Sequence, residues 1–110
     1  MEDALVSLHV TLPDAHRAQA MARTLVDERL VACVNIVPGV TSVYRWEGER
    51  QEDSEVLFLA KTAAPLLEAV TRRITELHPY ELPCVVAVPV VGGLPEYLDW
   101  VRRTTGEGTR

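Results

Sequence analysis

A short segment between two prolines carries the side chains best suited to bind a metal ion. Leu77-His78-Pro79-Tyr80-Glu81-Leu82-Pro83 displays an imidazole and a phenol close together, and the prolines restrict the backbone around them. A neutral imidazole is a good ligand for copper and similar metals. The same histidine, placed where a helix ends, is equally suited to cap the last carbonyl groups of that helix. The residues alone leave both interpretations open.

A second stretch combines aromatic and acidic residues. Tyr44 and Trp46 precede five carboxylates over nine positions, which are Glu47, Glu49, Glu52, Asp53 and Glu55. Such a stretch can attract cations or hold a ligand at a subunit junction, although a solvent-exposed hairpin has the same composition. Lys61, the only lysine, follows in an otherwise apolar strand. It either pairs with a carboxylate such as Glu55 or binds an anionic ligand.

The remaining reactive residues indicate structural roles. Free cysteine is usually buried, so Cys33 and Cys84 are both predicted to lie in the core. His9 and His16 are expected at the surface. Trp100, on the last helix, is expected to pack on the sheet or on a neighbouring subunit.

Motifs of known enzyme and metal sites do not occur in the chain. It has no CxxC, HxxxH or HExxH pattern and no nucleophile elbow or phosphate-binding glycine loop. We therefore predict a protein that is not an enzyme.

The composition predicts one compact domain that spans residues 1–110. Its 11 Lys+Arg against 16 Asp+Glu give a net charge of -5, which argues against nucleic acid as a partner. The longest apolar run, Cys84 to Gly93, is too short to cross a membrane and is broken by Pro89. The first twelve residues lack the pattern of a secretory signal. A cytoplasmic protein without membrane insertion is expected.

Hydrophobic periodicity predicts seven elements and a polar tail. Strands are expected at 4–11, 31–46, 55–62 and 84–91, helices at 14–30, 65–77 and 95–103, and the tail at 104–110. With right-handed crossovers this βαββαβ order predicts an α+β, ferredoxin-like sandwich with an antiparallel sheet, a long hairpin between its second and third strands and an extra C-terminal helix.

The strand prolines agree with the order 4-1-3-2 that this fold implies. Pro38 and Pro89 would both lie on edge strands, where a missing N–H is tolerated. Two helices cover only one face of such a sheet, yet the third and fourth strands are apolar on both faces. The uncovered face predicts a homo-oligomer, for which we favour a trimer.

Several motifs in order resemble the CutA divalent-cation tolerance family. They are VDERLVACVNIVPG at 26–39, TSVYRWEG at 41–48, Lys61-Thr62, LHPY at 77–80 and YLDW at 97–100. The resemblance implies a ferredoxin-like subunit in a homotrimer, cytoplasmic in bacteria, that is linked to tolerance of copper and other divalent cations.

The resemblance also implies a metal site. His78 matches a family position implicated in copper binding, but Val10 and Leu77 stand where some members have a cysteine and a second histidine. One imidazole holds a soft ion only with help from Cys33, carboxylates or other subunits. We therefore expect weak binding of copper or another divalent cation, with His78 and Cys33 as metal residues.

Two other functions stay open. The fold is shared with the trimeric PII signalling proteins, which bind small molecules between subunits. On that alternative the ligand cleft is expected to include Trp46, Glu55, Lys61, Tyr80 and Trp100. A third possibility is an anchoring module for a segment of a partner protein.

Overall fold

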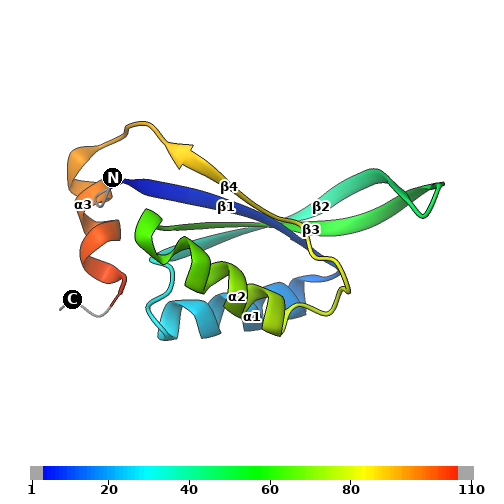
Figure 1. Cartoon of the computed structure of the whole chain (residues 1–110), viewed down its shortest axis with the longest axis horizontal. Coiled ribbons are helices and arrows are strands. Elements are labelled where there is room, and N and C mark those ends of the chain that lie inside the picture. Colours follow the sequence, from blue (N-terminus) through cyan, green and yellow to red (C-terminus); the bar gives the residue numbers. More distant parts are fainter. Residues whose placement is uncertain (1–3, 107–110) are drawn as a thin grey trace.

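The computed structural model describes residues 4–106, which form one four-stranded sheet with helices around it (Figure 1). The elements in order are β1 (Leu5–Leu12), α1 (Ala15–Asp27), β2 (Cys33–Trp46), β3 (Glu49–Ala63), the short 3-10 helix η1 (Ala64–Leu66), α2 (Leu67–Leu77), β4 (Val85–Val90) and α3 (Pro95–Thr104). This order confirms the predicted α+β, ferredoxin-like arrangement with an extra C-terminal helix.

The sheet is antiparallel with the strand order β2-β3-β1-β4, as the sequence predicts. Pro38 and Pro89 therefore lie on the two edge strands, where no ladder hydrogen bond is lost. Pro38 and Gly39 also mark a shift in the β2–β3 register between Val37 and Val40. Gly39 has a φ of 82°, a conformation that glycine adopts without strain.

The β2–β3 hairpin extends well beyond the rest of the sheet (Figure 1). β1 pairs only with the part of β3 from Val56 to Ala63, so the remainder of β3 has β2 as its one neighbour. A tight turn at Glu47 and Gly48, both with positive φ, closes the hairpin between the paired residues Trp46 and Glu49. β3 thus begins at Glu49, six residues before the predicted start at Glu55. The polar segment in between is a strand because it pairs with β2, and hydrophobic periodicity does not detect a polar strand.

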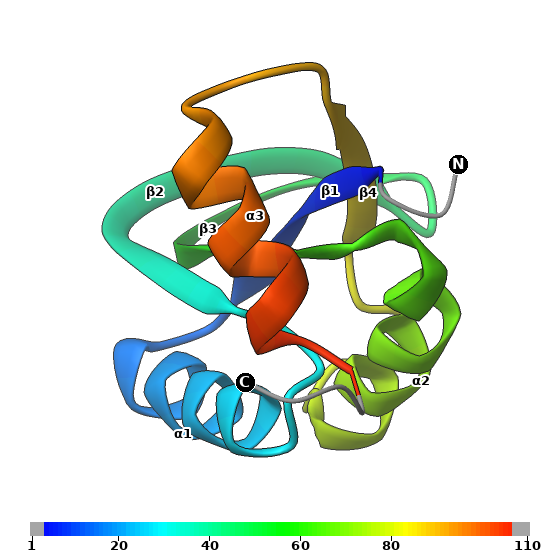
Figure 2. The same ribbon diagram turned by 90° about the vertical axis from the view of Figure 1, so that its left-hand side faces the viewer.

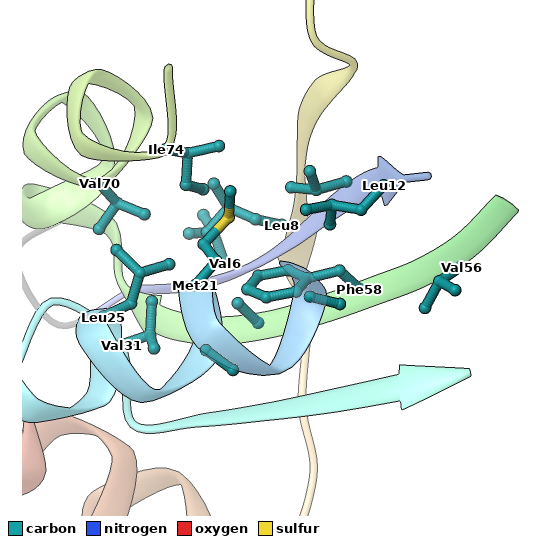
Figure 3. Close-up of a cluster of buried hydrophobic side chains, with 14 residues drawn as sticks. Val6, Leu8, Leu12, Met21, Leu25, Val31, Val56, Phe58, Val70 and Ile74 are labelled. Atoms are coloured by element: carbon teal, nitrogen blue, oxygen red, sulfur yellow. The ribbon is translucent and has the colours of Figure 1, made fainter. Parts of the chain in front are cut away.

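Helices α1 and α2 cover one face of the sheet and enclose the main core (Figures 1 and 3). Leu8 and Leu12 from β1, Phe58 from β3, Leu25 from α1 and Ile74 from α2 are fully buried there. Asp14 caps α1 by accepting a 2.8 Å hydrogen bond from the backbone N–H of Arg17. The apolar spacing that predicts the two helices is therefore the spacing of their buried faces.

α3 wraps around the end of the sheet where β1 starts and β3 and β4 finish (Figure 2). It forms a second small core in which Val101 packs with Leu5 and Ala32. The chain stays docked beyond the helix, since Thr105 is buried and the N–H of Gly106 donates to the carbonyl of Arg29. The prediction of a tail that starts at Thr104 is thus wrong as far as Gly106, because these residues belong to α3 or are docked against the domain. Residues 107–110 lie outside the described residues.

The other face of the sheet carries exposed apolar side chains. Val86 and Val88 of β4 and Val37 of β2 are exposed large hydrophobic residues, and His9 lies among them on β1. The register places His9 opposite Val86 on one side and Leu59 on the other. This is the uncovered face that the sequence predicts.

Candidate functional site

His78 is the residue at which α2 ends, and its ring is buried. Its backbone N–H donates to the carbonyl of Ile74, which closes the helix. The ring turns away from the helix end: Nε2 lies 2.8 Å from the carbonyl oxygen of Thr11, and Nδ1 accepts from the backbone N–H of Tyr80 at 3.1 Å. Because Nδ1 accepts, the proton lies on Nε2, which donates to Thr11. The imidazole is thus a bridge between α2 and the end of β1, and it does not cap α2.

Tyr80 contacts two potential metal ligands at once. Its N–H occupies the lone pair of His78, and its hydroxyl donates to Oε2 of Glu55 at 2.6 Å. The two rings lie beside each other with centroids 4.8 Å apart. Burial and the hydrogen bond to Glu55 raise the pKa of the Tyr80 hydroxyl well above its usual value, so it stays a donor at physiological pH. Tyr80 therefore occupies one imidazole nitrogen and one carboxylate oxygen.

A broad groove of about 970 Å³ opens beside this cluster, between the β2–β3 hairpin and the loop that follows α2. Tyr44, Trp46 and Tyr80 supply aromatic walls, and Asp53 and Glu55 supply carboxyl groups. The hydroxyl of Tyr44 donates to Asp53, and this contact raises the pKa of Tyr44. The groove is thus both acidic and aromatic, as the composition of the hairpin suggests.

A second polar cluster lies at the opposite end of the sheet. Lys61 pairs with Cys33 across β3 and β2, and its ammonium donates to Oδ1 of Asn35 at 3.1 Å. The Sγ of Cys33 lies 3.1 Å from the hydroxyl of Tyr97, whose ring in turn lies 5.5 Å from that of Trp100. The thiol contact, together with burial, raises the pKa of Tyr97 to about 12.

The structure brings together only some of the predicted site residues. Trp46, Glu55 and Tyr80 share the groove, whereas Lys61 and Trp100 lie at the α3 end. Lys61 of β3 pairs with Cys33 of β2 on one side and with Ser7 of β1 on the other, so Cys33 and Ser7 lie in the same row of the sheet. His78 contacts Thr11, which lies four residues beyond Ser7 on β1. Four strand residues span roughly 13 Å. One subunit therefore does not join Cys33 to His78.

Three predictions about single side chains need correction. Cys84 is exposed, because it lies one residue before β4 begins and at the wall of the groove. Cys33 is only half-buried, because it faces the uncovered side of the sheet and contacts Tyr97. Lys61 does not pair with Glu55, which lies six residues along the same strand and is bound by Tyr80.

Within residues 4–106, no three His, Cys, Asp or Glu side chains are grouped closely enough to hold a metal ion. His78 and Glu55 are linked through Tyr80, which donates one hydrogen bond to each of them. An imidazole with a carboxylate suits borderline ions such as Cu²⁺ and Zn²⁺ better than Ca²⁺ or Mg²⁺. The residues fit a cation of this class only if Tyr80 moves.

Sequence reasoning missed Asp53 and Tyr97 as individual contacts. The i, i+2 spacing of Asp53 and Glu55 in a strand places both on one face, and this signal was available for the groove. Tyr97 carried no signal, since its partner Cys33 is 64 residues away. The carbonyl of Thr11 could not be found from side-chain types.

The fold and the groove define a class: a ferredoxin-like α+β protein whose extended hairpin carries an acidic, aromatic groove. The particular family follows from comparison with known proteins. The model of the CutA1 divalent ion tolerance protein family matches residues 6–104. The chain belongs to this family, as the motifs in its sequence suggest.

Known relatives share most of this chain. The divalent-cation tolerance protein CutA of Thermus thermophilus is 50% identical over 97 residues, which cover 88% of this chain and 94% of that protein. The chloroplastic protein CutA of Arabidopsis thaliana is 44% identical over 100 residues, which cover 91% of this chain and 55% of that protein. The match therefore spans about half the length of the plant relative.

A solved structure agrees with the fold. The structure of the divalent cation tolerance protein from Thermus thermophilus superimposes with a TM-score of 0.90 at 48% identity, and the match covers 93% of this chain and 99% of that one.

None of the helices among residues 4–106 is both long and apolar enough to cross a membrane.

Proposed function

We propose that this protein acts in divalent-cation tolerance as a non-enzymatic, cytoplasmic homotrimer that binds copper or a similar cation weakly beside His78. Membership of the divalent ion tolerance family supports the general role. The observation that carries the site is that one residue, Tyr80, covers the lone pair of His78 with its N–H and the carboxyl of Glu55 with its hydroxyl.

A cation binds by taking the place of Tyr80. The unprotonated nitrogen of the imidazole is Nδ1, and its lone pair accepts from the N–H of Tyr80. Metal binding therefore costs that hydrogen bond and leaves the one from Nε2 to Thr11 intact. That second hydrogen bond fixes the tautomer and the orientation of the ring, as the outer partners of metal-bound histidines do. Displacement of the hydroxyl frees Oε2 of Glu55 to act as an oxygen ligand. Competition with Tyr80 is the physical reason for weak affinity.

Cys33 takes part only through assembly. It lies at the other end of the sheet from His78 in one subunit, so a site that contains both residues needs two subunits. The trimer is supported by the exposed apolar side chains of Val37, Val86 and Val88 on the uncovered face and by the overhanging hairpin. Light scattering of the protein should give the mass of three chains, and the mass of one chain would contradict the trimer.

Calorimetric titration with Cu²⁺ tests the site, with Zn²⁺ for comparison and a competing chelator present. We expect saturable binding whose stoichiometry follows the subunit count. His78→Ala should lose it, whereas His16→Ala, which removes an exposed imidazole on α1, should not. Equal binding by the wild type and His78→Ala would contradict the proposal. Both variants are compared at the same mass in solution, because a change in assembly alters binding by itself.

A small-molecule sensor of the PII type is a second candidate. The observation in its favour is the groove of about 970 Å³, which is large enough for a metabolite and has three aromatic walls. Thermal-shift screening separates the two candidates, because a ligand raises the melting temperature of the state it binds. Stabilisation by nucleotides or organic acids but not by metals favours the sensor and contradicts the metal role.

A further inference from the structure

His9 lies near the middle of the uncovered sheet face. It is the fifth of the eight residues of β1, and β1 is one of the two inner strands of the sheet. Residues that pair across an antiparallel ladder share a face, so His9 shares this face with Val86 of β4 and Leu59 of β3. Val86 is 51% exposed in the single chain, and His9 is exposed beside it. An imidazole thus stands at the centre of a largely apolar surface.

Assembly changes the surroundings of this ring. In the homotrimer proposed above, on which this inference rests, other copies cover the exposed valines of the face. Val86 is one of these valines and pairs directly with His9, so a copy that covers Val86 covers the imidazole as well. Removal from water costs far more for a protonated imidazole than for a neutral one. Covering the face therefore favours the neutral ring.

Charges of the chain itself near His9 act in the same direction. Leu59 and Val86 flank the ring in its own row, and β4 has no ionisable residue. Lys61 lies two residues beyond Leu59 on β3, where its ammonium repels an imidazolium ion. Glu55, the nearest carboxyl group of β3, lies roughly 13 Å along the strand in the other direction and accepts from Tyr80. The other ionisable groups toward the two ends of this face are Cys33, Tyr44, Asp53, His78, Cys84 and Tyr97.

We propose that His9 makes the trimer sensitive to acid, because a neighbouring copy covers the neutral ring and protonation of the ring opposes that contact. An imidazole in water ionises at about pH 6.5. Separate chains therefore bind a proton at His9 below this pH, whereas assembled chains do not. The trimer is then fully stable above about pH 7.5 and weakens as the pH falls. At pH 5.5 the loss is about tenfold for each ring and, with three equivalent rings, about thousandfold for the trimer.

Guanidinium unfolding at pH 7.5 and at pH 5.5, at one fixed protein concentration, measures the conversion of one trimer into three unfolded chains. The variants are His9→Gln, whose side chain is polar but cannot ionise, and His16→Gln, the matched change at an exposed imidazole on α1. Between pH 7.5 and pH 5.5, the equilibrium constant should shift toward unfolded chains about thousandfold more in the wild type than in His9→Gln. His16→Gln should follow the wild type within about tenfold. The effect of His78 is common to all three proteins and cancels in the comparison.

Proton NMR of the assigned histidine rings in the wild type gives a second measurement that no substitution disturbs. The His16 signal should move between pH 7.5 and pH 5.5, while the His9 signal should stay unchanged as long as light scattering gives the mass of three chains.

A mass of one chain at pH 7.5 would overturn the trimer and the role of His9 together. A three-chain mass with an equal pH effect in the wild type and His9→Gln, or with a His9 ring that titrates as His16 does, would overturn the role of His9 alone. A smaller pH effect in the wild type than in His9→Gln would also overturn it, since it would show that the neighbouring copy places a carboxylate beside His9.

Discussion

The hydrogen bond between Tyr80 and Glu55 should stabilise the fold measurably. The contact is 2.6 Å long and Glu55 is only 7% exposed, so Tyr80→Phe leaves a buried carboxyl group without this donor. Hydrogen bonds to charged groups contribute about 1.5–3 kcal/mol, and the half-buried position of Tyr80 places this one at the lower end. We expect Tyr80→Phe to lower the free energy of unfolding by about 1.5 kcal/mol.

Guanidinium unfolding at one fixed protein concentration provides the measurement, because the stability of an oligomer depends on concentration. A double-mutant cycle with Glu55→Gln isolates the pair, and Tyr80→Phe should cost about 1 kcal/mol less in that background. Tyr44→Phe is the matched control at an exposed carboxylate pair, with a smaller expected effect. Equal costs of Tyr80→Phe with and without Glu55 would refute the reasoning.

Three further predictions concern the fold and the α3 end. Phe58→Ala, at a fully buried position, should lower the free energy of unfolding by about 3–5 kcal/mol in the same assay, and a loss below 1 kcal/mol would contradict the core described. Arg29→Gly should raise the free energy of unfolding by about 0.5 kcal/mol. Arg29 has a φ of 62°, and the strain of this conformation in a non-glycine residue exceeds the extra chain entropy that glycine loses on folding. A decrease in the free energy of unfolding would contradict this. Ultraviolet titration should find the Tyr97 hydroxyl ionising near pH 12 and, in Cys33→Ala, closer to the usual 10, since the thiol contact raises its pKa; an unchanged titration would show that Cys33 is not the cause.

The fold was largely predictable because its signals are local. The apolar spacing of Met21 and Leu25, or of Val70 and Ile74, is the buried face of a helix. Proline positions added the strand order, since a residue without an N–H is tolerated at an edge. The start of β3 at Glu49 was missed because its polar residues form a strand only through their pairing with β2.

The candidate site was less predictable because its contacts are distant in sequence. His78 and Tyr80 were found together, being neighbours in a proline-bounded segment. Their partners lie on strands β1 and β3: Thr11 is 67 residues from His78, and Glu55 is 25 residues from Tyr80. The residue type also gave a wrong prediction for Cys84. Cysteine is usually buried, but Cys84 is exposed in a loop that lines the groove.

The copper affinity of Tyr80→Phe is the most direct test of the claim that a cation displaces Tyr80. This variant keeps the imidazole and frees the carboxyl of Glu55 from its donor. Chelator-competition titration should show Cu²⁺ bound about tenfold more tightly than by the wild type, because about 1.4 kcal/mol of competition is removed. Weaker or unchanged binding would contradict the account and would indicate that the Tyr80 hydroxyl does not compete with the metal.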